Sequence, residues 1–334
     1  MSDMPEPICR REFDTAALVA QFPPQFTNAN KQIVYGISCP PGAVHSGRVV
    51  FSRWAAMELP AEVPGAVTVI EPRADYFGYE PVASSFARVE WYLNFSHYDL
   101  FCAYRGPLFA QDEMQVTEHP ALGSLREALL KSDLKPLTVE DKKPTPALVR
   151  GVERRCRVRI DPDAPLGRPH GLYGNNFARA KSDAITRATE AIVPPTITNV
   201  LAMEAPAGGT GQYTRGEIEY ILTTAYTGFL ATRCESIEMF DLPPEVVVHT
   251  GYWGCGAYGG HRVLMALLQI VAAKLAGLDR LVFHTGDASG SATLSNALAV
   301  VERDIGLGTA PGPLATVIDK LDAMAFQWGV GDGN

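Results

Sequence analysis

Apolar runs of strand length and a longer apolar stretch alternate most clearly between residues 246 and 287. Residues 246–250 are a β-branched run that follows two prolines, which is typical of a buried parallel strand. Residues 262–276 are apolar on almost every side, so they predict a helix packed between other layers. Residues 281–285 predict the next strand. The region is therefore predicted to form a strand, a glycine-rich loop, a buried helix and a second strand.

Strand patterns dominate the first half of the chain. β-Branched and aromatic residues cluster or alternate in four segments that predict strands: residues 32–39, 48–54, 66–70 and 88–95. Residues 147–160 predict another strand with arginines on its exposed side, and residues 196–203 predict the strand before a glycine-rich turn. Between them, residues 167–180 lack helical periodicity and predict a polar and aromatic loop.

Helical periodicity marks four further segments: residues 121–131, 214–230, 289–302 and 314–325. Thr214 and Glu217 have the spacing of a capping box, which fixes the start of the second of these helices. Because strands alternate with helices after a strand-rich first half, the sequence predicts a mixed three-layer α/β fold.

Composition excludes several classes of protein. The chain has 334 residues, of which 46% are hydrophobic and 20% are charged, as expected for a globular protein. Its net charge of −8 argues against direct binding to duplex nucleic acid, because nothing offsets the repulsion of phosphates. No apolar run reaches the length that spans a membrane. The oligomeric state is not predicted.

The six cysteines are scattered, without the spacing of a zinc site or of a disulfide framework. We therefore expect reduced thiols, no bound metal and no cofactor. The first residues are acidic and contain no apolar core of a secretory signal. Together these features predict a cytoplasmic protein.

The loop from Gly251 to Gly260 contains five glycines and three large aromatic residues ahead of the predicted helix. Free backbone amides and the helix dipole at such a position favour a phosphate group. A tight crossover between strand and helix is the alternative, and the dinucleotide-binding fingerprint with its acidic residue is absent.

The eleven residues Thr250 to Gly260 read Thr-Gly-Tyr-Trp-Gly-Cys-Gly-Ala-Tyr-Gly-Gly. They closely resemble the loop Thr-Gly-Asn-Trp-Gly-Cys-Gly-Ala-Phe-Gly-Gly of the poly(ADP-ribose) glycohydrolases, which wraps the diphosphate and distal ribose of ADP-ribose. The resemblance extends over about residues 85–290. It implies a macrodomain-like three-layer α/β/α fold with a mixed central sheet, in which an N-terminal extension of residues 1–60 packs on a catalytic domain of residues 61–334.

The resemblance also implies a catalytic motif at Gln111-Asp112-Glu113, which is similar to the Gln-Glu-Glu motif of the family. Glu113 takes the position of the catalytic acid, and Asp112 is expected to bind the neighbouring ribose hydroxyl. From the residues alone, two adjacent carboxylates after a Gly-Pro loop also fit a solvated helix start. Residues expected to contact the ligand are Glu90, Asn94, Gln111, Gly251, Tyr252, Trp253, Gly254, Cys255, Gly256, Ala257 and Tyr258.

The chain departs from the family before this motif. It has Ala103-Tyr104-Arg105-Gly106 where the family has a glycine triplet, so a bulkier and charged turn is expected to fill the pocket or to contact a different ligand. Tyr173, Asn175 and Asn176 are similar to a tyrosine-bearing loop that lines the cleft of the family, and an ordinary turn explains them equally well.

Three functions follow from the resemblance and the departure. The first is a glycohydrolase acting on poly(ADP-ribose) or another ADP-ribosyl conjugate, with Glu113 as acid and then base. The second is a glycosidase acting on a smaller nucleotide or an NAD-derived metabolite. The third is a non-catalytic module that binds ADP-ribose. All three predict an ADP-ribose-containing ligand or a related nucleotide.

Overall fold

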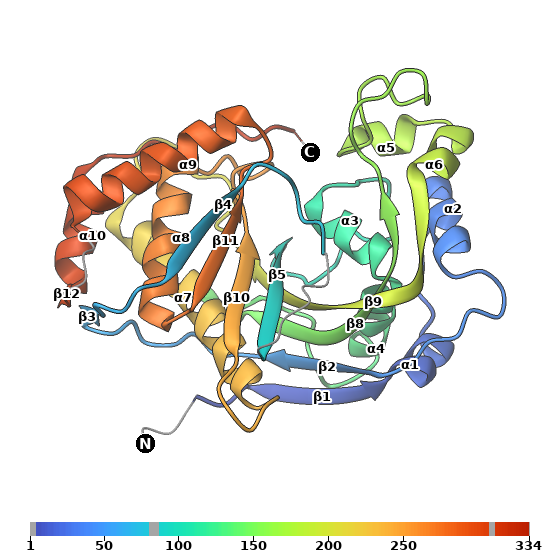
Figure 1. The fold of residues 1–334 in the computed structure, drawn as a ribbon, viewed down its shortest axis with the longest axis horizontal. Coiled ribbons are helices and arrows are strands. Elements are labelled where there is room, and N and C mark those ends of the chain that lie inside the picture. Colours follow the sequence, from blue (N-terminus) through green and yellow to red (C-terminus); the bar gives the residue numbers. More distant parts are fainter. Residues whose placement is uncertain (1–4, 80–86, 307–310, 334) are drawn as a thin grey trace.

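A twisted eight-stranded sheet runs through the molecule in the computed structural model, which describes residues 5–79, 87–306 and 311–333 (Figure 1). Its strands in spatial order are β1 (Cys9–Asp14), β2 (Arg48–Arg53), β8 (Ala147–Val158), β9 (Thr189–Glu204), β5 (Arg88–Ser96), β10 (Glu245–Thr250), β11 (Arg280–His284) and β4 (Val69–Arg73). Strands β1, β2, β8 and β9 pair antiparallel, and β9, β5, β10, β11 and β4 pair parallel. The sheet is therefore mixed.

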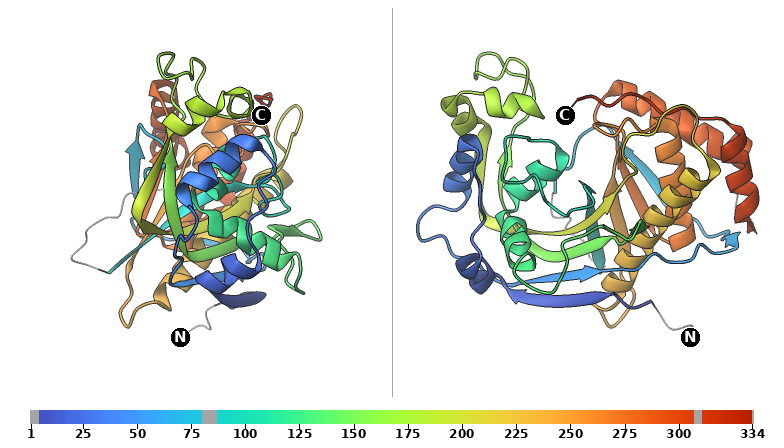
Figure 2. Two further views of the ribbon diagram at one scale, coloured as in Figure 1. Left: turned by 90° about the vertical axis from the view of Figure 1, so that its right-hand side faces the viewer. Right: turned by 180° about the vertical axis from the view of Figure 1, so that it is seen from behind.

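Helices cover both faces of this sheet (Figures 1 and 2). One side carries α7 (Arg215–Ile237), α8 (Arg262–Ala276), α9 (Ala288–Val300) with a π turn (Val301–Ile305), and α10 (Leu314–Ala323). The other side carries α1 (Thr15–Gln21), α2 (Ala29–Ser38), α3 (Gln111–Glu118), α4 (Pro120–Leu129), α5 (Asn175–Arg179) and α6 (Ser182–Ala188). Two small two-stranded sheets pair β3 (Glu62–Val63) with β12 (Gly312–Pro313) and β6 (Val139–Glu140) with β7 (Lys143–Pro144). The predicted three-layer α/β/α architecture with a mixed sheet is confirmed.

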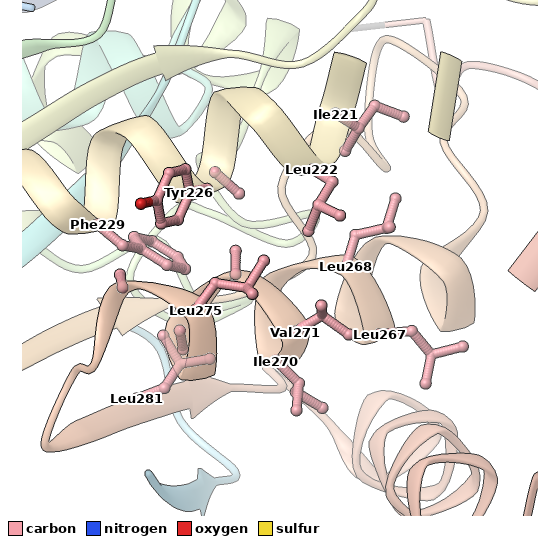
Figure 3. Packing of buried hydrophobic residues seen from close by; sticks show 14 of the residues in the cluster. Ile221, Leu222, Tyr226, Phe229, Leu267, Leu268, Ile270, Val271, Leu275 and Leu281 are labelled. Carbon is pink, nitrogen blue, oxygen red and sulfur yellow. The ribbon is translucent and has the colours of Figure 1, made fainter. Parts of the chain in front are cut away.

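The largest core lies between α7, α8 and the sheet. Leu222 and Phe229 of α7 face Leu268 and Val271 of α8, and Leu281 of β11 closes the layer from the sheet (Figure 3). All five are fully buried. Burial of each such side chain contributes roughly 1.5–3 kcal/mol to the free energy of unfolding. This layer fixes α8 and therefore the loop that precedes it.

The side chains of β5 point alternately into the core and toward α3. Its odd-numbered residues Val89, Trp91 and Leu93 belong to the core with α7 and α8. Because side chains alternate along a strand, Asn94 faces the opposite layer, where it contacts α3. The polar face of β5 is thus turned toward the predicted catalytic helix.

The parallel strands place five loops at one edge of the sheet. The carboxyl ends of β5, β9, β10, β11 and β4 meet there because the five strands run in the same direction. Open α/β sheets bind ligands at this edge. The Gly251 loop follows β10, and the segment leading to α3 follows β5.

Most predicted elements are confirmed, including both strands and the helix of residues 246–287. The strand predicted over residues 32–39 is wrong, because these residues lie in α2. Asn28 caps that helix by accepting hydrogen bonds from the amides of Asn30 and Lys31, and Val34 is buried against the sheet layer. Capping and packing thus override the β propensity of the segment.

Prolines account for two shifted strand boundaries. Strand β4 was predicted to end before Pro72, yet Pro72 pairs with Phe283 inside it. Because β4 is the edge strand, a residue without an amide hydrogen is tolerated there. Strand β9 begins at Thr189 rather than at residue 196, and its two prolines lie in a register shift of the β8–β9 ladder between residues 191 and 196.

The loop predicted over residues 167–180 contains the short helix α5, and the following α6 had no predicted counterpart. Asn175 and Asn176 are the first residues of α5, and the left-handed conformation is taken by Gly174, at φ 60°, instead of by either asparagine. The two asparagines therefore do not form the ordinary turn that was the alternative for them.

The arginines of β8 do not all lie on an exposed side, so that part of the prediction is wrong. Arg154 is buried and forms an ion pair with Glu118 at 2.9 Å, while Arg155 is buried beside Glu153. The carboxylate of Glu118 also accepts a hydrogen bond from the amide of Val158 at 2.7 Å. A buried arginine persists here because its carboxylate partner is buried with it.

The N-terminal 60 residues contribute β1 and β2 to the central sheet. The boundary at residue 60 stays a prediction. Among the described residues, no helix is both long and apolar enough to cross a lipid bilayer.

Replacing Arg154 by Met should lower the free energy of unfolding by about 3–5 kcal/mol, because Glu118 is left as a buried, unpaired carboxylate. Urea denaturation measures this loss. The matched control is Arg159→Met, which breaks an exposed ion pair with Glu190 and should cost less than about 1 kcal/mol. Equal losses for the two variants would contradict the structural role of the buried pair.

Candidate active site

The first turn of α3 carries the predicted catalytic motif. Gln111, Asp112 and Glu113 open the helix, where acidic side chains interact favourably with the helix dipole. The Oε2 atom of Glu113 accepts a hydrogen bond from the amide of Ala110 at 3.0 Å, so its carboxyl group folds back over the start of the helix. The other carboxyl oxygen, Oε1, takes no part in this bond.

Both carboxyl groups are buried, with only 7% of Asp112 and 4% of Glu113 exposed. The solvated helix start considered as an alternative is therefore wrong. Burial raises the pKa of both groups, and the charge of Glu113 raises that of Asp112 further. Two adjacent buried carboxyl groups cannot both ionise cheaply, so the pair retains a proton at higher pH than free side chains do.

Asn94 and Gln111 connect α3 to β5. The Nδ2 atom of Asn94 donates to Asp112 Oδ1 at 3.1 Å and to Gln115 Oε1 at 2.9 Å. The side chain of Gln111 forms two hydrogen bonds with the backbone of β5. Its Oε1 accepts from the amide of Phe95 at 2.7 Å, and its Nε2 donates to the carbonyl of Leu93 at 2.9 Å. Both side chains thus position the first turn of α3, and their direct contact with a ligand stays a prediction.

Lys31 of α2 is a buried cation near the pair that the sequence did not reveal. Its side chain is fully buried, and its Nζ donates a hydrogen bond to the carbonyl of Tyr104 at 2.9 Å. Burial lowers the pKa of Lys31 to about 8, although the charges of Glu113 and Asp112 oppose this effect. No motif in the sequence links residue 31 to residues 112 and 113, because the contact depends on the fold.

The turn that replaces the glycine triplet directs its two large side chains toward Glu127 of α4. Tyr104 is fully buried, and its hydroxyl donates to Glu127 at 2.5 Å while accepting from the amide of Gln25 at 2.8 Å. Arg105 binds the same Glu127 through two nitrogens. That this turn narrows the pocket or contacts a different ligand stays a prediction.

The glycine-rich loop after β10 is anchored by Trp253. Its indole is fully buried, and Nε1 donates to the carbonyl of Met203 at 3.0 Å. Gly254 has φ +75°, and a Cβ atom there would lie 2.4 Å from the Cβ of Ala205. Only glycine fits this close approach, so the sequence Trp-Gly sets the path of the loop.

Several amides of the loop are available to a ligand. The amide of Trp253 bonds the carbonyl of Gly251 at 2.8 Å, and that of Cys255 bonds the carbonyl of Tyr252 at 3.0 Å. Among the described residues, the amides of Gly254, Gly256 and Ala257 donate to no protein acceptor. Successive free amides form an anion-binding concavity. The amides of Gly254, Gly256 and Ala257, without that of Cys255, are thus the candidate donors for the predicted phosphate site, which stays a prediction.

The two tyrosines of the loop point in different directions. Tyr252 donates to the carbonyl of Gly290 in α9, and Arg262 lies 5.1 Å above its ring. The hydroxyl of Tyr258 lies 3.4 Å from Glu204 at the end of β9. Burial raises the pKa of Tyr258, and the charges of Glu204 and Asp112 add to this effect. Tyr258 thus lies within electrostatic reach of the catalytic turn.

Residues 328–333, the tail segment, lie against this loop. The amide of Gly329 donates to the carbonyl of Gly259 at 2.8 Å, and the amide of Asp332 donates to that of Gly256 at 3.3 Å. A Cβ atom at Gly256 would lie 3.2 Å from Oδ2 of Asp332. The tail segment therefore places the Asp332 carboxylate beside the predicted diphosphate cradle.

Tyr173 and Asn175 approach the tail segment from the opposite loop. Asn175 Nδ2 donates to the carbonyl of Gly333 at 3.5 Å. The ring of Tyr173 is 39% exposed, but its hydroxyl end is desolvated, which raises the pKa of Tyr173 to about 12 together with the charges of Asp332 and Glu113. Tyr173 therefore lies within electrostatic reach of both Asp332 and Glu113. Asn176 bonds the carbonyl of His170 instead.

Glu90 belongs to a different cluster from Asp112 and Glu113. Its Oε2 accepts from the hydroxyl of Tyr92 at 3.1 Å and lies 3.6 Å from Nε2 of His249. His249 Nδ1 is 3.0 Å from Nε2 of His284, whose pKa is lowered to about 4 by burial and by the His249 charge. His284 is the last residue of β11 and His249 is the penultimate residue of β10, and the sequence patterns did not mark either as a site residue. Among the described residues, no cluster of three His, Cys, Asp or Glu side chains has the geometry to hold a metal.

Three solved structures share low identity with the chain. Poly(ADP-ribose) glycohydrolase from Thermomonospora curvata is 15% identical over 86% of this chain and 85% of its own, with a TM-score of 0.45. The same enzyme bound to the inhibitor ADP-HPD is 15% identical over 87% and 84%, with a TM-score of 0.44. Poly(ADP-ribose) glycohydrolase from Deinococcus radiodurans in complex with ADP-ribose is 11% identical over 87% and 95%, with a TM-score of 0.42.

A family model described as poly(ADP-ribose) glycohydrolase, macro domain fold, matches residues 170–292. The matched segment contains Tyr173, β9, β10, the glycine-rich loop and β11, whereas the Gln111–Glu113 motif precedes it. The similarity to the poly(ADP-ribose) glycohydrolase family, macro domain fold, is thus carried by residues 170–292.

Proposed function

We propose that the protein is a glycohydrolase that cleaves the ribose glycosidic bond of poly(ADP-ribose) or of another ADP-ribosyl conjugate. The observation that carries this proposal is the buried Asp112–Glu113 pair, in which desolvation raises the pKa of both carboxyl groups and so favours a protonated acid. Glycoside hydrolysis needs such an acid beside the bond that breaks. The family match over residues 170–292 supports the same reaction class.

Glu113 supplies the proton in this reaction. Its Oε2 is held by the amide of Ala110, so Oε1 carries the proton toward the oxygen that leaves the anomeric carbon. The bond between that oxygen and the anomeric carbon breaks, and a water molecule attacks the oxocarbenium-like centre. Glu113 then takes a proton from the water, which restores the acid. Asp112, held by Asn94, binds the neighbouring ribose hydroxyl.

The glycine-rich loop binds the diphosphate in this proposal. The amides of Gly254, Gly256 and Ala257 are the available donors, and the charge on a diphosphate suits such a concavity. Tyr258 packs on the distal ribose from the same loop. An ADP-ribose-containing molecule is therefore the proposed ligand.

A glycosidase acting on a smaller nucleotide or an NAD-derived metabolite is the second candidate. It is favoured by the turn at residues 103–106, which lacks the glycine triplet of the family, and the same carboxyl pair would serve it. The six free cysteines support a cytoplasmic location for either enzyme.

Replacing Glu113 by Gln should lower kcat/KM for release of ADP-ribose from poly(ADP-ribose) by at least about 100-fold, because the proton donor is lost. The amide oxygen of glutamine can still accept from Ala110, so the fold of α3 should be kept. Calorimetry should give a dissociation constant for ADP-ribose within about 3-fold of the wild type, because the substitution removes a proton donor and keeps the shape of the side chain.

The control for this variant is Glu190→Gln, which changes an exposed glutamate outside the cleft and should leave turnover unchanged. Full activity in Glu113→Gln would refute the proposed acid. Binding of ADP-ribose without turnover of any conjugate by the wild type would instead identify a binding module. Turnover of a smaller NAD-derived nucleotide alone would identify the second candidate.

The pH dependence of kcat/KM follows from the raised pKa values. The protonated acid is the active form, so activity should be present on the acid side and lost as the pH rises through the raised pKa of the pair. A free glutamate would already be ionised above about pH 5–6. We therefore expect the midpoint of the alkaline fall above about pH 6. A midpoint near that of a free carboxyl group would contradict a desolvated acid.

A further inference from the structure

The segment before α2 holds the turn that leads into the catalytic helix. The amides of Thr27 and Asn28 both donate to the carbonyl of Arg105, at 2.9 and 3.1 Å. The hydroxyl of Thr27 donates to the same carbonyl at 2.8 Å. The Nζ of Lys31 donates to the carbonyl of Tyr104 at 2.9 Å. Four hydrogen bonds from residues 27–31 thus fix the two residues at which the chain departs most from the glycine triplet of the family.

Lys31 also brings a positive charge to the buried pair. The packing of α2 against α3 places it within electrostatic reach of Asp112 and Glu113, and its side chain is fully buried. In the described part of the chain, Lys31 forms no ion pair with a carboxylate at 4.0 Å or less. Its charge therefore acts on the pair as a whole.

Arg126 of α4 is a second cation whose charge lowers the pKa of Asp112, and it is also bound to Asp99 through two hydrogen bonds at 2.7 and 3.0 Å. The charge of Lys31 lowers the pKa of both Asp112 and Glu113. Burial raises the pKa of Cys102 to about 11 and that of Tyr173 to about 12, and it raises the pKa of Tyr258. These three groups are neutral at neutral pH.

We propose that Lys31 is a positioning residue of the candidate active site, which fixes the turn before α3 and balances the negative charge of the Asp112–Glu113 pair. This inference rests on the proposed glycohydrolase function for its catalytic consequence. Without the ammonium, the pair binds its proton more tightly, because a nearby positive charge favours the ionised form of a carboxyl group. The proton is then released later as the pH rises.

The test compares Lys31→Met with Lys31→Arg in the full chain. In Lys31→Met, the alkaline fall of kcat/KM should move upward by at least about 0.5 pH unit, and kcat should fall because the base form of Glu113 is harder to reach. Lys31→Arg keeps the charge and should keep the midpoint within about 0.2 pH unit of the wild type. An unmoved midpoint in an active Lys31→Met variant would overturn the inference.

A readout without substrate separates this inference from the proposed function. Titration of carboxyl carbons by NMR should show the upward shift for Asp112 and Glu113 in Lys31→Met, whether or not any conjugate is cleaved. If Lys31→Met is too unstable to titrate, Lys31→Gln, which can still donate to Tyr104, replaces it. Titration curves that coincide with those of the wild type would overturn the role of the charge even if the enzyme is active.

A second inference rests on the tail segment. Trp328 anchors it, since its ring stacks on Tyr213 with centroids 4.1 Å apart and its amide donates to the carbonyl of Gly211 at 2.8 Å. Beyond this anchor, Gly331 approaches the loop so closely that a Cβ atom would lie 2.3 Å from the carbonyl oxygen of Ala257. Val330 is 94% exposed, so the tail segment crosses the loop at the surface.

We infer that the tail segment is a strap over the proposed diphosphate cradle, and that it competes with an anionic ligand. Its Asp332 carboxylate lies beside Gly256, one of the three residues with available amides. A carboxylate and a diphosphate favour the same donors and repel each other. Ligand binding therefore requires the strap to move, while Trp328 stays in place. This inference shares the proposed ligand with the proposed function.

Replacing Gly331 by Ala should displace the strap, because its Cβ atom has no room beside Ala257. We expect ADP-ribose to bind at least about 3-fold more tightly by calorimetry, with a smaller gain for Asp332→Asn. Val330→Ala changes an exposed side chain of the same segment and should leave the affinity unchanged. Equal or weaker binding by Gly331→Ala would overturn competition while leaving the proposed ligand intact. Failure of every variant to bind ADP-ribose would refute the ligand and the strap together.

Discussion

The desolvation of two adjacent carboxyl groups is the constraint on which the candidate site depends. Asp112 and Glu113 are almost fully buried at the start of α3, where ionisation of both would be costly. The surrounding contacts partly offset this cost. Asn94 donates to Asp112, the amide of Ala110 donates to Glu113, and Lys31 supplies a positive charge. An acid that stays protonated near neutral pH is the chemical result of this arrangement.

The sheet supplies the geometry that this chemistry needs. Parallel pairing of β9, β5, β10 and β11 brings the catalytic turn and the glycine-rich loop to one edge. The buried layer of α7 and α8 holds the loop from one side, and Trp253 extends that layer into the loop itself. Gln111 ties α3 to β5, and residues 27–31 hold the turn that precedes α3. The two loops are therefore anchored separately at one edge of the sheet.

Local signals made the centre of the fold predictable. The β-branched run of β10, the glycines after it and the all-apolar α8 each specify one structure over a short distance. The resemblance to the family motif likewise marked Asp112 and Glu113 as candidates, but the motif does not show that they are buried. Long-range contacts were not predictable from the sequence. Lys31 comes near the Asp112–Glu113 pair only through the fold. Arg154 is buried because Glu118 lies opposite, and the Tyr104 side chain points toward α4 because Glu127 accepts its hydroxyl. The strand wrongly predicted over residues 32–39 failed for the same reason, since capping by Asn28 and packing of Val34 decide it.

The central claim is that Glu113 and the glycine-rich loop act on one ligand. A crystal structure of the protein with ADP-ribose tests it most directly. The account predicts diphosphate oxygens on the amides of Gly254, Gly256 and Ala257, and the anomeric oxygen within hydrogen-bond reach of Glu113 Oε1, at about 3 Å. Well-defined ADP-ribose bound elsewhere, or bound in the cleft with its anomeric carbon far from Glu113, would contradict it.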